Sequence, residues 1–478
     1  LSLSLSLLSS PLLSLPLSYT KSMTMKRSLS SPSSLLFHLL ITPLLLCQAN
    51  RVSVSMPPSE AETLFKIMDS MSSDQPWRHS HPNPCAPGSS WPGIECKTGP
   101  DHLPHVSRLD FGSAPNPSCK PSASFPNLIF TLPFLQSVFF FNCFTHFTTT
   151  IIFPIKPIPN SSLQQLSLRS NPSLSGQIPP LISSLKSLQI LTLSQNRLTG
   201  EIPPAVFSLK SLVHLDLSYN KLTGKIPLQL GNLNSLVGLD LSYNSLTGNI
   251  PPTISQLGML QKLDLSSNSL FGAIPEGVEK LRSLSFMALS NNKLKGAFPK
   301  GISKLQSLQY FLMDNNPMFV PLPIELGFLP KLQEVQLENS GYSGVIPESY
   351  TKLMNLSSLS LANNRLAGEI PSGFDSLPHV FHLNLSRNLL IGVVPFDSSF
   401  LRRLGKNLDL SGNRGLCLNP EDEFSVVKTG ADVCGKNVTA VALPHSTRKK
   451  SCAGPSWYYR SCFFSIALFQ FALFRLLL

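Results

Sequence analysis

The stretch that decides the fold is Leu212-Val213-His214-Leu215-Asp216-Leu217-Ser218-Tyr219-Asn220-Lys221-Leu222-Thr223-Gly224-Lys225-Ile226-Pro227. Its leucines follow the spacing L-x-x-L-x-L-x-x-N, which predicts a short strand that turns one apolar side to a core. The phrase recurs every 24 residues, or 25 at the first and last steps, and ends each time on an asparagine except at Ser340. The recurring asparagines are Asn171, Asn196, Asn220, Asn244, Asn268, Asn292, Asn316, Asn364, Asn388 and Asn413.

One such strand cannot bury its leucines alone, whereas stacked copies bury them against one another. The period therefore predicts a solenoid of about eleven turns across residues 163–413. We expect the recurring asparagine to be structural, because its side-chain amide can satisfy backbone N–H and C=O groups in the turn beneath each strand. Glycine and an Ile-Pro pair follow in most turns, where they permit a tight bend and then an extended segment.

The segment from Leu236 to Pro251 nearly spells out L-x-x-L-x-L-S-x-N-x-L-x-G-x-I-P, the consensus of the plant-specific class of leucine-rich repeats. More than half of the chain resembles this class. The resemblance implies an α/β solenoid, a right-handed twisted arc whose strands line the concave face. In that class the concave face usually binds partners.

The two ends of the chain indicate passage through the secretory pathway. Lys26-Arg27 precede an apolar run from Leu35 to Leu46, which is typical of a signal peptide cleaved after Ala49. The Leu-Ser alternation at the start resembles a translated leader. The predicted organisation is a leader artefact at 1–24, a signal peptide at 25–49, an N-terminal cap with degenerate first repeats at 50–162, leucine-rich repeats at 163–413, a C-terminal cap at 414–436, a linker at 437–461 and an apolar membrane tail at 462–478.

Apart from Cys47 in the signal peptide, the cysteines lie outside the repeats, as expected if disulfides staple the two caps of the solenoid. We expect the pairs Cys85–Cys96, Cys119–Cys143 and Cys417–Cys434; the segment around the first pair resembles the N-terminal cap of plant repeat receptors. His79 and His81 lie near Cys85, but no second pair of metal-ligating residues follows them in the sequence. We therefore expect no metal site. The possible N-glycosylation sites are Asn160, Asn355, Asn384 and Asn437.

The apolar run from Cys462 to Leu478 allows two kinds of membrane attachment. It is either a short transmembrane helix or a signal that is exchanged for a lipid anchor. Either one leaves the repeats on the extracellular face of the plasma membrane.

No kinase motif follows the repeats, and the whole chain is similar to plant leucine-rich-repeat receptor-like proteins. That resemblance implies a non-catalytic receptor or co-receptor, acting in defence or development, that needs no cofactor. Its partners would be a peptide ligand or the ectodomain of a receptor kinase, which would supply the signalling.

The formal net charge of +12 leaves a second function open. A basic surface could favour an acidic cell-wall polysaccharide, so the alternative is a secreted wall protein that binds polysaccharide or inhibits a wall enzyme. Nucleic acid is not an expected partner, because no basic cluster with interleaved aromatic residues is present.

Three aspartates, Asp216, Asp240 and Asp264, are expected to stack in register on neighbouring strands of repeats three to five. Carboxylates ~5 Å apart would match the pair of a retaining glycosidase. These residues occupy the Leu-Asp-Leu-Ser consensus of the family, however, so we interpret them as structural and predict no enzyme.

The outward strand positions change character in repeats six to eight. The turn after Asn316 also loses its glycine, and Ser340, followed by Gly341 and Tyr342, replaces the ladder asparagine. Aromatic residues beside carboxylates are typical of a protein-binding hot spot, suited to a basic or amphipathic peptide or a partner ectodomain. The alternative is drift in repeats that still pack. The predicted ligand-binding residues are Phe286, Tyr310, Leu312, Asp314, Glu334, Gln336 and Glu338, with Ala288 beside them.

Overall fold

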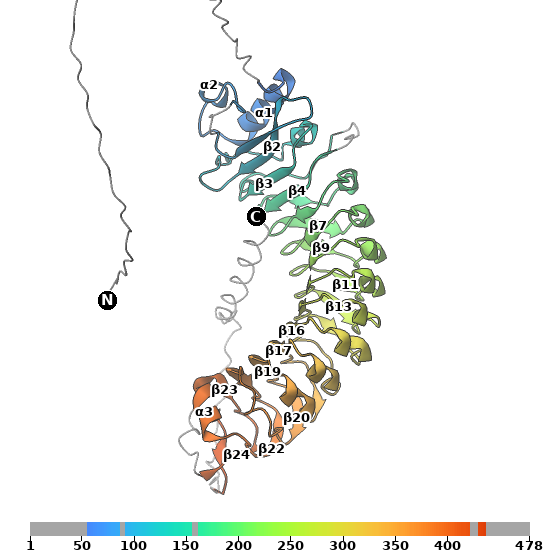
Figure 1. Ribbon diagram of the computed structural model, residues 1–478, viewed down its shortest axis with the longest axis vertical. Helices are drawn as coiled ribbons and strands as arrows, with labels where there is room; N and C mark the ends of the chain where they lie inside the picture. Colours follow the sequence, from blue (N-terminus) through green and yellow to red (C-terminus); the bar gives the residue numbers. More distant parts are fainter. Residues whose placement is uncertain (1–54, 87–90, 155–160, 421–428, 436–478) are drawn as a thin grey trace, which may run out of the picture. The chain divides into compact units, whose positions relative to one another are not determined.

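The computed structural model describes residues 55–86, 91–154, 161–420 and 429–435, which belong to one unit of the chain (Figure 1). The expected signal peptide, linker and membrane tail, and the sequons at Asn160 and Asn437, lie outside these residues. Within the described ranges, no helix has the length and apolar character needed to cross a membrane.

Successive turns stack into a curved solenoid, and one sheet of 14 strands lines its inner side (Figure 1). The first pair of strands is antiparallel, and the later pairs are parallel. The strands are β1 (Ile94–Thr98), β2 (Pro104–Phe111), β3 (Ser137–Phe141), β4 (Gln165–Arg169), β6 (Ile190–Thr192), β8 (His214–Asp216), β10 (Gly238–Asp240), β12 (Lys262–Asp264), β14 (Phe286–Ala288), β16 (Tyr310–Leu312), β17 (Glu334–Gln336), β19 (Ser358–Ser360), β21 (His382–Asn384) and β23 (Leu408–Asp409).

The repeat period explains the register of this sheet. Leu215, Leu239 and Leu263 pair side by side on β8, β10 and β12, and each is at most 1% exposed. Because each turn of the chain adds one strand at the same height, the leucine columns merge into one continuous core. The predicted leucine-rich-repeat solenoid is confirmed.

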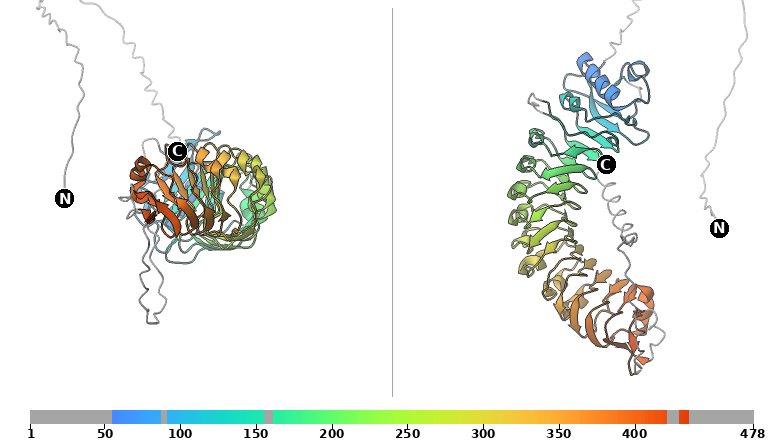
Figure 2. Two further views of the ribbon diagram at one scale, coloured as in Figure 1. Left: turned by 90° about the horizontal axis from the view of Figure 1, so that it is seen from below. Right: turned by 180° about the vertical axis from the view of Figure 1, so that it is seen from behind.

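Short 3-10 helices form the outer side of the solenoid, as the view from behind in Figure 2 also shows. Most begin just after the Ile-Pro pair and send one apolar side chain inward, such as Val206 and Ile254. They are η1 (Asn127–Thr131), η2 (Pro180–Ser184), η3 (Pro204–Ser208), η4 (Leu228–Asn232), η5 (Pro252–Gln256), η6 (Val278–Lys280), η7 (Lys300–Lys304), η8 (Ile324–Phe328) and η9 (Glu348–Lys352).

A second set of short parallel strands follows the asparagine ladder along one flank of the solenoid. It consists of three separate sheets within the described residues, and one of the two breaks between them falls at the turn after Asn316. The strands are β5 (Ser175–Gly176), β7 (Arg197–Glu201) and β9 (Lys221–Thr223); β11 (Thr247–Gly248), β13 (Ser269–Gly272) and β15 (Lys293–Leu294); and β18 (Ser343–Gly344), β20 (Arg365–Gly368), β22 (Leu389–Val393), β24 (Gly415–Leu418) and β25 (Asp432–Val433).

The ladder asparagines bond neighbouring turns, as the sequence predicts. The Asn220 side-chain oxygen accepts the Leu198 N–H at 3.0 Å, and its Nδ2 donates to the carbonyls of Leu193 and Leu217 at 2.8 and 3.1 Å. Each amide therefore replaces backbone partners that the turn itself cannot supply. The same three bonds recur at Asn244, Asn268, Asn292, Asn316, Asn364, Asn388 and Asn413.

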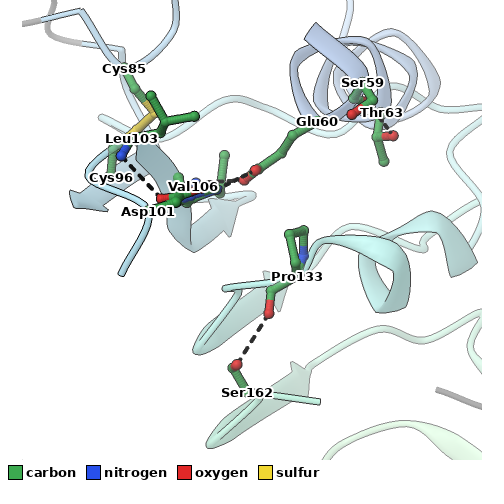
Figure 3. A network of polar contacts seen from close by, with 11 residues as sticks. Ser59, Glu60, Thr63, Cys85, Cys96, Asp101, Leu103, Val106, Pro133 and Ser162 are labelled. Carbon is green, nitrogen blue, oxygen red and sulfur yellow. Dashed lines mark hydrogen bonds and ion pairs between the residues drawn. A yellow bond between two sulfur atoms is a disulfide. The ribbon is translucent and has the colours of Figure 1, made fainter. Parts of the chain in front are cut away.

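Helices α1 (Pro58–Met71) and α2 (Trp77–Ser80) cover the N-terminal end of the sheet. Buried Glu60 on α1 accepts the Val106 N–H of β2 at 2.9 Å (Figure 3). Its other oxygen lies 2.6 Å from His105 Nδ1, so the acid is paired on both sides. These contacts join the first helix to the second strand and close the exposed end of the solenoid.

Disulfides hold both caps in the pairing that we expect from the sequence: Cys85–Cys96, Cys119–Cys143 and Cys417–Cys434. The last of these joins β24 to the residue after β25, beyond helix α3 (Ser398–Leu404) and η10 (Gly405–Asn407). Phe400 and Leu401 of α3 are buried against the last repeats. The C-terminal end of the core is thus covered as well.

Candidate ligand-binding site

The first outward column of the concave sheet gathers Phe286, Tyr310 and Glu334, which pair in register on β14, β16 and β17. The two rings lie 6.0 Å apart between centroids, and the Tyr310 hydroxyl donates to Gln333 Oε1 at 3.3 Å. All three side chains are half-buried, and burial raises the pKa of the Glu334 carboxyl. The column thus offers two aromatic edges beside one carboxylate, all within reach of a partner.

The second outward column contains Ala288, Leu312 and Gln336, directly beside the first. Ala288 is buried, whereas Leu312 and Gln336 stay half-exposed. The Gln336 amide donates to Glu334 and thereby orients that carboxylate. This column supplies one apolar contact, Leu312, and one polar contact, Gln336, but no aromatic ring.

The third column contains Asp314 and Glu338, at the positions where other repeats have serine. We expected the Asp314 side chain to be exposed, but it is only 8% exposed. It accepts hydrogen bonds from Ser290 and Asn315. Burial raises its pKa. Glu338 remains half-exposed and accepts the Ser360 hydroxyl at 2.7 Å, so it is the carboxylate of this pair that a ligand can reach.

Ser340 explains the irregular turn after Asn316. A serine hydroxyl is too short to bond that turn as an asparagine amide does, so the Met318 N–H donates to the Ser340 backbone carbonyl at 3.0 Å. Phe319 then takes a positive φ of 50°, one residue before the usual glycine position, and its ring is 61% exposed. Tyr342 occupies the position of the core leucine that follows each ladder residue, so it is fully buried and cannot contact a ligand.

A hollow of about 520 Å³ opens beside this turn, on the flank where the second set of strands is broken. Its lining includes Asn315, Phe319, Asn339, Gly341, Asn363 and Arg365. Asn315 directly follows Asp314 in the chain, and Asn339 directly follows Glu338, so the hollow adjoins the third column of the concave face. Sequence reasoning singled out this turn and Gly341, but it missed Arg365, because an arginine after a ladder asparagine also occurs at Arg197.

The aspartates of repeats three to five bond a serine of their own repeat, and Asp240 also pairs with a lysine of the next repeat. Asp216 and Asp240 each accept the hydroxyl of the serine two residues later at 2.7 Å, and Lys262 Nζ lies 2.9 Å from Asp240. Burial, and then the neighbouring Asp240, raises the pKa of Asp264 to about 7 and also raises that of Asp216. These carboxylates are therefore part of a half-buried polar row. Among the described residues, no group of histidine, cysteine or acidic side chains is arranged to hold a metal.

The two described sequons lie in different surroundings. Asn355 is exposed on the outer side after η9, and its amide donates to the Pro330 carbonyl. Asn384 lies half-buried on β21, where its oxygen accepts the Ser386 hydroxyl at 2.7 Å. Asn384 pairs with Ser360 of β19, so a glycan on Asn384 would lie on the concave face two strands from Gln336.

The comparisons with known proteins support the repeat fold. The leucine rich repeat family matches residues 186–246, 258–318 and 330–390. Receptor like protein 29 of Arabidopsis thaliana is 92% identical over 455 residues, which cover 95% of this chain and 98% of that protein. The chain therefore belongs to the leucine-rich-repeat receptor-like proteins, a family of a non-enzymatic kind.

Two more distant similarities concern only part of a chain. Protein TOO MANY MOUTHS of Arabidopsis thaliana is 37% identical over 138 residues, covering 28% of this chain and 27% of that protein. Among solved structures, the ectodomain of the Arabidopsis thaliana membrane receptor kinase GASSHO1/SCHENGEN3 in complex with CASPARIAN STRIP INTEGRITY FACTOR 2 matches with a TM-score of 0.59 and 27% identity. That match covers 78% of this chain but only 44% of the receptor ectodomain.

Proposed function

We propose that the protein is a cell-surface receptor or co-receptor that binds a peptide or a partner ectodomain and signals through a separate receptor kinase. The binding surface is the concave face of repeats six to eight. Asp314 is buried at the edge of this surface and supports it. The contact residues are Phe286, Tyr310, Leu312, Glu334, Gln336 and Glu338. The observation that carries this proposal is the change in the outward columns of repeats six to eight. Aromatic rings enter the first column, Leu312 and Gln336 stand in the aspartate column, and Asp314 and Glu338 replace serine in the third. Hot spots in protein interfaces have this composition.

Membrane attachment on the extracellular face is part of the proposal. It is supported by the likeness to receptor-like proteins and to the ectodomain of a plant receptor kinase, itself solved in complex with a partner. The disulfides in both caps fit an oxidising extracellular compartment. A peptide with basic or amphipathic character would complement Glu334, Glu338 and the two aromatic rings.

The test begins with crosslinking at the surface of plant cells that express the full-length protein, followed by identification of the receptor kinases that it captures. The affinity of each purified pair is then measured for wild type and for the double variant Tyr310→Ala with Glu338→Ala. We expect binding to weaken at least tenfold, since a central aromatic and a charged contact are each worth more than ~1 kcal/mol.

The matched control is His214→Ala, at the first strand position of repeat three, which corresponds to Tyr310 in repeat seven. Its affinity should equal that of wild type. Equal affinities for the control and the double variant would contradict the proposed surface. Release of the protein from untreated membranes, together with binding to pectin in place of any receptor kinase, would favour the wall-protein alternative.

A further inference from the structure

The hollow beside the turn after Asn316 exists because two departures from the repeat coincide. Phe319 occupies the turn. Gly341, which directly follows the ladder position at Ser340, has no side chain there. A Cβ at Gly341 would lie 2.5 Å from Phe319 Cδ1, so glycine is required for the ring to settle there. Gly341 also has a φ of 71°, which disfavours other residues. The space between Pro317 and Arg365 is therefore built into the fold.

Among the described residues that line this hollow, Arg365 carries the only formal charge. Its guanidinium lies 5.5 Å from the centroid of the Phe319 ring, which holds the planar group against the turn. Over the residues that the structure describes, Arg365 is exposed and forms no salt bridge, whereas Arg78 and Arg108 each pair with acids. Arg365 thus offers a positioned guanidinium with free donors.

Asparagine side chains extend this donor set. Asn339 and Asn363 are exposed and line the hollow, and the Asn363 amide donates to Asn339 Oδ1, so this bond does not use the Asn339 amide nitrogen. Carboxamide and guanidinium N–H groups together complement a carboxylate, since arginine binds that group through two parallel hydrogen bonds. No acidic residue lines the hollow to compete.

We propose that this hollow binds the carboxylate of an aspartate or glutamate side chain in the peptide or partner ectodomain that occupies the concave face. This inference rests on the proposed function and adds a requirement to it. The ligand places basic or amphipathic residues against Glu334 and Glu338 on the concave face. It places an acidic residue in the hollow, against Arg365.

Two features favour a protein ligand over an acidic polysaccharide. The hollow adjoins Asp314 and Glu338 through consecutive residues, so a ligand on the concave face reaches it without a break. The carboxylates of that face would repel a polyuronate, whose charge is negative along its whole length.

The test selects phage-displayed random dodecapeptides on the immobilised full-length protein in detergent. We expect the recovered peptides to share an acidic residue at a fixed distance from a basic or aromatic one. Arg365→Gln should weaken these peptides roughly tenfold, the size of one charge-assisted hydrogen-bonded contact. Changing the shared acidic residue of the peptide to its amide should cost the same factor on wild type and nothing further on Arg365→Gln.

Arg197→Gln is the matched control, because Arg197 follows Asn196 as Arg365 follows Asn364 but has no Phe319 beside it. It should bind all selected peptides like wild type. Peptides that depend on Tyr310 and Glu338 but tolerate Arg365→Gln would overturn this inference and leave the proposed function intact. Failure to recover any peptide, with Arg365-dependent binding of oligogalacturonate in its place, would overturn both.

Discussion

Repeats three to five and repeats six to eight share the same strand positions but arrange their polar groups in opposite ways. In the regular segment, defined by β8, β10 and β12, Asp216 and Asp240 accept a hydroxyl from a serine of their own repeat. In the irregular segment, defined by β14, β16 and β17, acids occupy the serine column. There Ser290 donates to Asp314 of the next repeat, and Ser360 donates to Glu338 of the repeat before.

This difference shows how a repeat protein acquires a binding surface without losing its core. The leucine columns and most ladder bonds continue unchanged through the irregular segment, whereas the outward columns lose the self-contained Asp–Ser pairs. Polar groups that are no longer satisfied within one repeat become available to neighbours and to a ligand. The ladder, the aspartate row and the buried tyrosines should therefore differ between the two segments as their contacts indicate.

The largest expected effect distinguishes the ladder asparagines from Ser340. Asn292→Ala removes partners from the Leu270 N–H and from the carbonyls of Leu265 and Leu289, all buried. We expect the free energy of unfolding to fall by about 3 kcal/mol, against about 1 kcal/mol for Ser340→Ala. Urea unfolding of both variants measures the difference. Equal losses would mean that the irregular turn depends on its ladder residue as strongly as the regular turns do.

The next effect concerns pH and the aspartate row of the regular segment. The pKa of Asp264 is about 7 in the folded protein, raised by burial and by Asp240, whereas an unfolded aspartate titrates near ~3.9. The folded state therefore holds the proton more tightly, and stability falls as pH rises through the window between these values. We expect a loss of ~2 kcal/mol between about pH 5 and pH 7.

Asp264→Asn should flatten this dependence and raise stability at neutral pH. Thermal unfolding at a series of pH values measures both. A pH profile of the Asn variant that parallels wild type would show that the row is not protonated as the structure indicates.

The smallest expected effect distinguishes two buried tyrosines of the irregular segment. The Tyr342 hydroxyl is buried without a hydrogen-bond partner in the described part of the chain, whereas the Tyr350 hydroxyl donates to the Pro323 carbonyl at 3.1 Å. Tyr342→Phe should stabilise the protein by about 1 kcal/mol, and Tyr350→Phe should destabilise it by about the same amount. Chemical unfolding measures both, and shifts of the same sign would contradict the assigned hydrogen bonds.

The solenoid could be predicted from sequence because its determinants are periodic. Leucine spacing fixes which side chains meet, and the asparagine ladder marks every turn, so the strands and the ladder follow from counting. The cap cysteines were equally informative, since they lie in pairs outside the repeats.

The details of the binding site depend on contacts between repeats, which a single strand does not reveal. Asp314 occupies an outward position, but its side chain is short and accepts a hydrogen bond from Ser290 of the preceding repeat. It is therefore buried. Tyr342 follows an irregular residue and yet fills the place of a core leucine. Arg365 gains its role from Phe319, more than one repeat away, and no local spacing signals that contact.

The central claim is that the irregular segment, and not the regular one, is where a partner binds. Hydrogen–deuterium exchange of the full-length protein, with and without a captured receptor kinase ectodomain, tests it most directly. The partner should slow exchange in β16, β17 and the turn at residues 317–320, and leave β8 and β10 unchanged. Protection confined to β8 and β10, or none in β16 and β17, would contradict the account.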